Sequence, residues 1–225
     1  MNIMALLASP HGLKGNTAGL LRLVLSGAEA EGARTETIFL PGGTVLPCKS
    51  CYACHKTGRC VVKDEFEPLK KKLLAADGIV LASPNYIFNV SAQMKAFMDR
   101  CSGIIHCMSF WGKYGASVVT SGGGDEKAVA ALMNRYLVVT GAVPIGAAGA
   151  NMSAMPEGDF TTEVKKNAAA LGRKLVRAWK AGTVPPRVAK DRDAFKDRML
   201  SLMKYRGKDW PYEVQYWREK RGVDI

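Results

Sequence analysis

Residues 2–17 read NIMALLASPHGLKGNT, and this stretch joins a short apolar run to a loop of turn-forming residues. The run Asn2–Ala8 predicts a buried β-strand. The loop Ser9–Thr17 leads from it into a predicted helix that ends near Gly32, with one apolar face made of Leu20, Leu21, Val24, Leu25 and Ala28. A strand, a polar loop and an amphipathic helix in this order predict the first unit of an α/β fold.

The loop between this strand and helix has the composition of a phosphate-binding turn. Free N–H groups and the positive end of the dipole at a helix N-terminus attract anions. Gly12 and Gly15 let the backbone approach an anion closely, while Ser9, Asn16 and Thr17 offer side-chain donors. The alternative is an ordinary turn in which Asn16 or Thr17 caps the helix.

The same alternation continues through the chain to about residue 180. Further strands are predicted at Thr35–Leu40, Gly78–Ala82, Ala116–Thr120 and Ala142–Ala148. Further helices are predicted around Phe66, Leu69 and Leu73, over Ser91–Cys101 and Asp125–Thr140, and through Val164, Ala168, Leu171, Leu175 and Ala178. We therefore predict an α/β domain over residues 1–180, with an open five-stranded parallel sheet and helices on both faces.

Three of the predicted strands end in loops rich in Ser, Gly, Pro or Asn. These loops are Ser9–Thr17, Ser83–Tyr86 and Ser121–Gly124. In open parallel sheets, ligands bind outside the carboxyl ends of the strands, where the strand order reverses. The sequence therefore predicts a ligand site that is built from all three loops.

Two of these loops carry a family resemblance. Ser-Pro-x-x-x-x-Gly-Asn-Thr after the first strand and Ser-Pro-Asn-Tyr after the third resemble the NAD(P)H-dependent FMN reductases, which are flavodoxin-like proteins. The resemblance covers about residues 1–180 and implies FMN as cofactor and NAD(P)H as a possible electron donor. Many relatives carry Arg where this chain has His11, so Lys14 is the alternative source of positive charge for the phosphate.

The resemblance also implies a set of cofactor-binding residues. Around the FMN phosphate it places Ser9, His11, Asn16, Thr17 and Ala18. Along the isoalloxazine ring it places Pro84, Asn85, Tyr86 and Ile87, and from the next loop Ser121, Gly122 and Gly123. Because FMN carries the redox chemistry, no protein nucleophile or general base is expected.

A compact cysteine motif lies in a loop over about residues 41–64. Cys48, Cys51, Cys54 and Cys60 fall within thirteen residues, with gaps of two, two and five. The first two gaps match the start of a ferredoxin motif, and four thiolates are what a 4Fe–4S cluster needs. The placement after the second strand is similar to that in the iron–sulfur flavoproteins, and this resemblance implies such a cluster close to the flavin.

Other interpretations of this motif remain open from the sequence. Four cysteines also suit zinc, although zinc sites usually have two separated Cys-x-x-Cys pairs. Cys51 and Cys54 could instead form a thiol redox pair, or the motif could have lost its cluster. His55 is expected to be a surface residue rather than a ligand, and Cys101 and Cys107 are expected to be core thiols.

Residues 181–225 form a basic C-terminal extension after a linker at Pro185 and Pro186. From Phe160 to Ile225 the chain holds 17 Lys and Arg against 8 Asp and Glu, a net charge of 17 − 8 = +9. The whole chain has a net charge of +12, so most of it lies in this last part. Its Tyr and Trp residues suggest packing against another subunit in a homodimer or homotetramer. A ferredoxin-like acidic carrier is the next partner considered, and neither nucleic acid nor a membrane is expected. The N-terminus lacks the features of a signal peptide, which favours a cytoplasmic location.

The sequence thus favours an electron-transfer flavoprotein that uses FMN and a 4Fe–4S cluster between a redox carrier and an acceptor. One alternative is an NAD(P)H-dependent FMN or quinone reductase without a functional cluster. Another is a non-enzymatic sensor that uses the same scaffold with a zinc or thiol switch.

Overall fold

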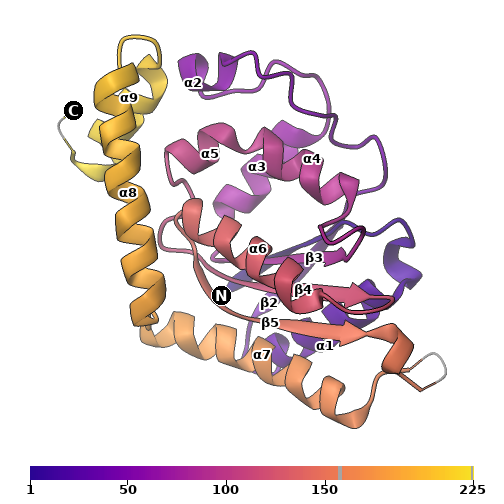
Figure 1. Cartoon of the computed structure of the whole chain (residues 1–225). Helices are drawn as coiled ribbons and strands as arrows, with labels where there is room; N and C mark the ends of the chain where they lie inside the picture. Colours follow the sequence, from indigo (N-terminus) through magenta and orange to yellow (C-terminus); the bar gives the residue numbers. More distant parts are fainter. Residues whose placement is uncertain (157–158, 224) are drawn as a thin grey trace.

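The computed structural model describes residues 1–156, 159–223 and 225. Its sheet consists of β1 (Asn2–Leu7), β2 (Arg34–Phe39), β3 (Gly78–Pro84), β4 (Tyr114–Ser121) and β5 (Val143–Asn151). The strands are all parallel and run in the order β2-β1-β3-β4-β5 (Figure 1). Every residue of β3 and β4 is buried, as expected for central strands that are covered on both faces. The predicted α/β class and parallel sheet are confirmed.

Helices cover both faces of the sheet and create two separate cores. One face carries α1 (Asn16–Glu29) and α7 (Thr162–Ala181). The other face carries α3 (Phe66–Ala75), α4 (Ala92–Arg100), α5 (Ser102–His106) and α6 (Glu126–Val139). Successive side chains of each strand enter opposite cores, so that Leu6 packs with the α3–α6 side and Leu7 with the α1–α7 side.

The strand order brings the predicted loops together at one edge of the sheet. β1 pairs with β2 on one side and with β3 on the other. The strand order therefore reverses at β1, which is where ligands bind in open parallel sheets. The carboxyl ends of neighbouring strands are tied to one another: Ala8 N donates to Ala82 O at 2.9 Å, and Asn85 N donates to Thr120 O at 2.7 Å. The loops that follow β1, β3 and β4 therefore share this edge.

Residues 181–225 contain two helices that the sequence analysis did not predict. They are α8 (Pro186–Arg206) and α9 (Pro211–Arg221), and each begins with a proline in its first turn. In Figure 1, α8 runs along one side of the domain and brings α9 beside α2 (Ala53–Thr57), a short helix in the cysteine loop. Trp210 and Trp217 of the extension are buried in a third small core with Met108, Met199, Met203 and Val214.

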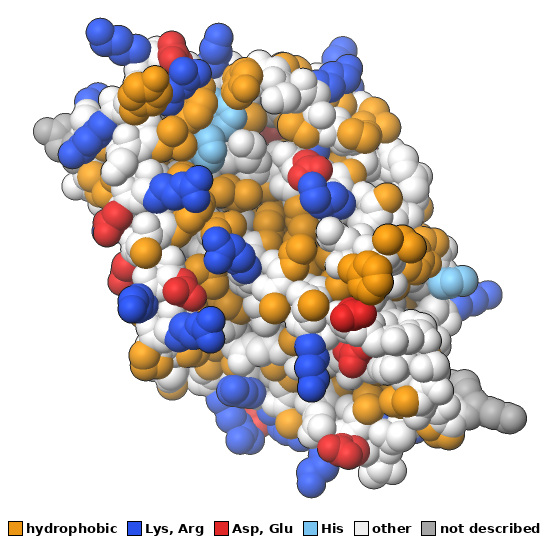
Figure 2. All heavy atoms as spheres, viewed as in Figure 1, with side chains coloured by type: hydrophobic (Ala, Val, Ile, Leu, Met, Phe, Trp, Pro, Cys, Tyr) orange, Lys and Arg blue, Asp and Glu red, His pale blue; other side chains and the backbone are white. Residues whose placement is uncertain are grey.

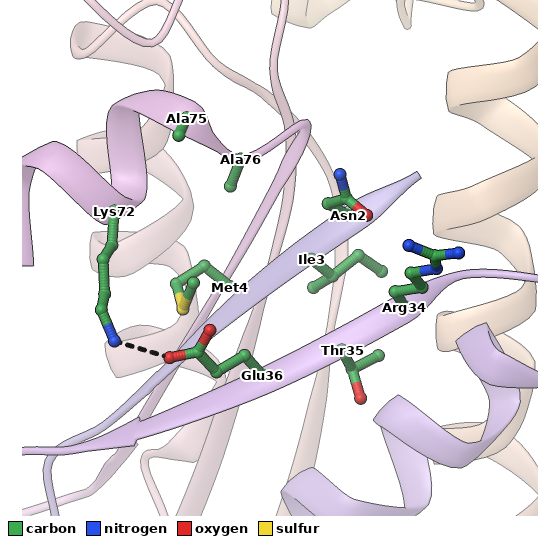
Figure 3. Close-up of a pocket in the computed structure, with 9 residues that line it drawn as sticks. All are labelled: Asn2, Ile3, Met4, Arg34, Thr35, Glu36, Lys72, Ala75 and Ala76. Atoms are coloured by element: carbon green, nitrogen blue, oxygen red, sulfur yellow. Dashed lines mark hydrogen bonds and ion pairs between the residues drawn. The ribbon is translucent and has the colours of Figure 1, made fainter.

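Two hollows lie away from the loop edge. A cavity of about 410 Å³ lies over the first halves of β1 and β2, where Lys72 and Glu36 form an exposed ion pair at 2.8 Å (Figure 3). A larger groove of about 900 Å³ lies between α6, β5 and α8. Figure 2, which is viewed from the same side as Figure 1, shows Lys and Arg side chains spread widely over the face in view. Neither hollow includes a residue of the predicted cofactor set.

Within the described ranges, the helices are all too short or too polar to cross a lipid bilayer.

Candidate functional site

The loop after β1 forms an open helix start. Gly12 adopts a φ of +57° at the start of a 3₁₀ turn, η1 (Gly12–Lys14). Gly15 occupies the N-cap of α1, so no side-chain oxygen at that position satisfies the first N–H groups of the helix. The alternative in which Asn16 or Thr17 caps the helix is wrong, because both already lie inside its first turn.

The predicted phosphate residues are placed unequally around this helix start. Ser9, Thr17 and Ala18 are buried at its base, whereas His11, Lys14 and Asn16 are exposed. The Thr17 hydroxyl lies 2.6 Å from that of Thr120 at the end of β4, which ties the loop to the sheet. An anion that rests on the free N–H groups would therefore have the exposed side chains of Lys14, His11 and Asn16 nearby and buried residues beneath it.

The loop after β3 presents apolar side chains to the outside through a strained turn. Tyr86 and Asn89 pair across a two-residue turn, in which Tyr86 N donates to Asn89 O at 2.8 Å. Both central residues have positive φ, +49° for Ile87 and +62° for Phe88, a conformation that favours Asn and Gly. Ile87 is 90% exposed and Phe88 75% exposed. Strain of this kind persists where the surroundings impose it, and it is concentrated at ligand sites.

Asn85 links this loop to the one after β4 and provides a test of the flavin site. Its Nδ2 donates to Gly124 O at 2.9 Å, while its Oδ1 is buried and has no protein partner. Added Cβ atoms on Gly122 and Gly123 would meet no atom within 4 Å, so the space beside these glycines is open. An unpaired acceptor in the loop that contacts the glycine loop suits the polar, N–H-bearing edge of an isoalloxazine ring.

Ser121 organises the loop after β4. Its Oγ accepts from Gly124 N at 3.1 Å and donates to Glu126 at 2.9 Å. Pro84 is the buried last residue of β3, and Tyr86 is 42% exposed. The residues predicted to line the ring thus come from two adjacent strand ends.

All four cysteines of the motif line one cavity. The cavity has a volume of about 310 Å³ and is lined by Cys48, Cys51, Cys54 and Cys60, with Arg100 at its wall. Cys48 and Cys51 are exposed, and Cys54 and Cys60 are half-buried. The loop reaches this arrangement through positive φ values at Ser50 (+50°), Tyr52 (+60°) and Gly58 (+74°). Four soft thiol ligands around one cavity fit an iron–sulfur cluster or zinc.

A buried ion pair fixes the base of the cysteine loop. Arg100 Nη1 lies 2.7 Å and Nη2 3.1 Å from the two carboxylate oxygens of Asp64, and Arg100 also donates to Leu46 O. A bidentate pair of this kind is both strong and directional. Sequence reasoning did not find these two residues, since nothing in their spacing links them.

The remaining two cysteines do not line the cavity shared by the motif cysteines. Cys101 and Cys107 are buried in the core, as the sequence predicted. Burial raises the pKa of the Cys101 thiol to about 12 and raises that of Cys107 further. Metal ligation requires the thiolate, which burial of this kind opposes.

His55 corrects an expectation from the sequence. It is not a surface residue: only 4% of it is exposed, and it stacks against Trp210 with ring centroids 4.6 Å apart. Burial lowers the pKa of His55, but hydrogen bonds to Cys54 and Glu213 outweigh that effect and raise the pKa to about 9. The partner Glu213 comes from the C-terminal extension, a contact that sequence spacing could not reveal.

Comparisons with known proteins identify the family of this chain. The model of the family described as NADPH-dependent FMN reductase matches residues 1–156. An iron-sulfur flavoprotein of Archaeoglobus fulgidus is 33% identical over 98% of this chain and 99% of its own length. The chain belongs to the iron–sulfur flavoprotein group of the NADPH-dependent FMN reductase family. It is therefore an FMN-dependent flavoprotein oxidoreductase.

Other relatives of this flavoprotein support the same assignment. An iron-sulfur flavoprotein of Methanosarcina thermophila is 34% identical over 65% of this chain and 78% of that protein. A WrbA-like flavodoxin structure from Agrobacterium tumefaciens superposes with a TM-score of 0.55 at 18% identity, covering 81% of this chain and 99% of that one. An apo NADH:FMN oxidoreductase structure gives 0.59 at 15% identity, covering 83% and 92%. These two structures show the flavodoxin-like fold of the flavoprotein.

The unpaired oxygen of Asn85 leads to a prediction about flavin affinity. Asn85→Ala should weaken FMN binding by about tenfold, because a hydrogen bond worth about 1.4 kcal/mol to the ring would be lost. Titration of the flavin-free protein with FMN, followed by quenching of flavin fluorescence, measures this. Asn167→Ala, at an exposed asparagine of α7, is the matched control and should bind FMN like the wild type. Equal affinities for the Asn85 and Asn167 variants would remove Asn85 from the site.

Proposed function

We propose that this flavoprotein transfers electrons between a redox carrier and an acceptor by means of FMN and a 4Fe–4S cluster. When bound, FMN supplies one- and two-electron chemistry and the cluster supplies one-electron transfer. The single observation that carries the proposal is the cavity lined by all four motif cysteines, in a chain that belongs to a flavin-binding family. Cys48, Cys51, Cys54 and Cys60 are the proposed cluster ligands.

The protein's part in this function is to bind and orient. The N–H groups at the start of α1, with Lys14 and His11 beside them, would hold the phosphate. Asn85 would accept a hydrogen bond from the ring, and the loops after β3 and β4 would flank it. Arg100 holds the cysteine loop against α4 and lies at the wall of the cluster cavity, where its charge offsets that of the thiolates.

Cofactor analysis tests the proposal directly. Protein purified without oxygen should contain about four iron atoms, about four sulfides and about one FMN per chain. Fewer than about three irons would contradict the 4Fe–4S assignment, and stoichiometric zinc would replace it. A protein that binds no FMN, as purified or after addition, would contradict the flavin site instead.

An NAD(P)H-dependent FMN or quinone reductase without a cluster is the second candidate. The description of the matching family as NADPH-dependent FMN reductase favours it, and the matched residues 1–156 contain all three loops proposed to bind the flavin. The visible spectrum separates the two functions. A broad, bleachable absorption beneath the flavin bands supports the first proposal, and flavin bands alone support the second.

The partners are proposed from charge and exposure. An acidic, ferredoxin-like carrier would suit the basic surface of a chain with a net charge of +12. A homodimer or homotetramer is also proposed, with NAD(P)H as a possible donor. Trp210 and Trp217 pack within the chain, whereas Tyr205 is 82% exposed and remains available for a subunit contact. Light scattering on the full chain measures the mass of the assembly and so distinguishes a monomer, a dimer and a tetramer.

A further inference from the structure

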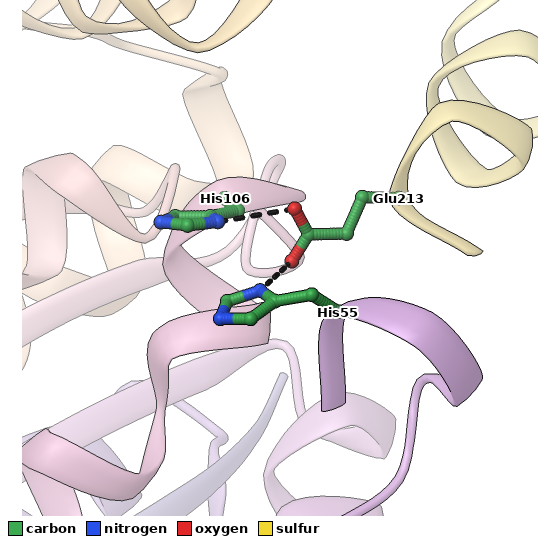
Figure 4. A group of neighbouring side chains, drawn as sticks. All are labelled: His55, His106 and Glu213. Carbon is green, nitrogen blue, oxygen red and sulfur yellow. Dashed lines mark hydrogen bonds and ion pairs between the residues drawn. The ribbon is translucent and has the colours of Figure 1, made fainter. Parts of the chain in front are cut away.

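A fully buried carboxylate joins the C-terminal extension to the cysteine loop. Glu213 of α9 is 0% exposed, and its two oxygens meet two imidazoles (Figure 4). Oε1 accepts from His55 Nδ1, and Oε2 lies 3.0 Å from His106 Nδ1. His55 belongs to α2 and follows Cys54 directly, while His106 ends α5. One side chain thus connects three segments that are far apart in the sequence.

The geometry of this group favours a hydrogen-bonded clasp over a cation site. The rings of His55 and His106 are stacked, with centroids 4.6 Å apart and planes at 23°. Each Nδ1 faces its own oxygen of the Glu213 carboxylate at hydrogen-bonding distance (Figure 4). A carboxylate oxygen accepts hydrogen bonds, and an imidazole Nδ1–H can donate one to each oxygen of Glu213.

Residues close to Glu213 in the sequence make further contacts with the cysteine loop and with α5. Trp210 stacks on His55, and Trp217 Nε1 donates to His106 O at 3.0 Å. At the C-terminal end of α2, the ring of Tyr212 lies so close to Gly58 that an added Cβ would approach it to 2.3 Å. The helix α9 therefore contacts the cysteine loop at His55 and, one turn later, at Gly58.

The helix α2 is too short to be stable without contacts to the rest of the chain. α2 has five residues, fewer than an isolated helix needs to be stable in water. It carries Cys54, which lines the shared cavity, and its first residue follows Tyr52 with a φ of +60°. Burying an unpaired carboxylate is very costly, so Glu213 favours the one arrangement in which both imidazoles reach it.

We propose that α9 acts as a clasp on the cysteine loop, in which Glu213 is a positioning residue that orients α2 and thereby aims Cys54 at the cluster cavity. The inference rests on the proposed function for the cluster itself, but the clasp is a property of the chain without metal. The ligand for which the clasp positions Cys54 is an iron–sulfur cluster. The C-terminal extension contributes to the site by holding α2 in place.

The test compares Glu213→Leu and Glu213→Gln with Glu219→Gln, an exposed carboxylate on the same helix. In the full chain without metal, hydrogen exchange at the amides of residues 53–58 should be at least about tenfold faster in Glu213→Leu. Glu213→Gln, which still bonds one imidazole, should show a smaller increase of about threefold, and Glu219→Gln none. Unchanged exchange in the Glu213 variants would overturn the clasp.

Cluster loading gives the second readout. After anaerobic reconstitution with ferrous iron and sulfide, Glu213→Leu should hold at most about a third of the wild-type iron and lose it to a chelator about tenfold faster. FMN affinity should stay within about twofold of the wild type, because the flavin loops are elsewhere. Loading and release equal to those of the wild type would overturn the positioning role.

The two hypotheses fail in different ways. A wild type that takes up no iron would overturn the proposed function, whereas the exchange experiment would still decide the clasp. If Glu213→Leu does not fold, as judged by far-ultraviolet circular dichroism, Glu213→Gln decides it. Its exchange and chelator release must then exceed those of Glu219→Gln, and equality would reject the clasp.

Discussion

Replacing Cys51 by serine should lower the iron content from about four atoms per chain to below about one, while FMN remains bound. Cys51 is exposed and lines the cavity shared by the four motif cysteines. A thiolate binds iron strongly, whereas a serine hydroxyl stays protonated near neutral pH and is a poor ligand for a cluster. Because the side chain is exposed, the substitution should change the free energy of unfolding of the metal-free chain by less than about 0.5 kcal/mol.

The matched control for this experiment is Cys101→Ser. Cys101 is fully buried next to the Tyr136 hydroxyl and lies outside the cavity, so this variant should keep its iron. Iron and sulfide analysis, with the visible spectrum, measures both variants. Loss of iron from Cys101→Ser with retention in Cys51→Ser would reverse the ligand assignment.

Gly172→Ala should destabilise the whole domain by about 3 kcal/mol or more. Gly172 of α7 faces α1 so closely that an added Cβ would lie 1.9 Å from Val24 O and 2.7 Å from Ala28 N. These are backbone atoms of α1, so they cannot turn aside as a side-chain end can. The same contact seen from α1 leaves Gly27 without room for a Cβ, which would lie 2.0 Å from Ala169 O. The two helices would have to move apart and open the core between them.

Urea unfolding followed by circular dichroism measures this effect. Gly42→Ala is the control, because an added Cβ there meets nothing within 4 Å, and its midpoint should change little. If Gly172→Ala had the same midpoint urea concentration as the wild type, the close approach of α1 and α7 in the structure would be wrong. Since the N-terminus of α1 is the proposed phosphate site, a stable variant should be examined for FMN affinity as well.

Local sequence patterns were sufficient to predict the sheet and the edge where the loops after β1, β3 and β4 gather. The apolar runs that become β3 and β4 indicate strands buried on both faces, and the structure extends them only by a few residues to Gly78–Pro84 and Tyr114–Ser121. Once such strands are parallel, the loops at their carboxyl ends must share an edge. The spacing of the cysteines likewise predicted that the four thiols could share one site.

Contacts between distant segments could not be predicted in this way. α8 and α9 have weakly amphipathic sequences, and α8 buries only Met199 and Met203, so their periodicity gave little signal. His55 was expected at the surface because nothing near it in the sequence suggests burial. Its partner Glu213 lies 158 residues away.

The sequence by itself therefore determined the class of fold, the loops that gather at one edge of the sheet and the four thiols that line one cavity. Each of these follows from short-range periodicity or spacing, which backbone geometry converts into position. Only the tertiary structure decided how the cysteine loop is held. The extension returns across the domain and buries Glu213 between His55 and His106, where both carboxylate oxygens can be satisfied only by residues from two other segments.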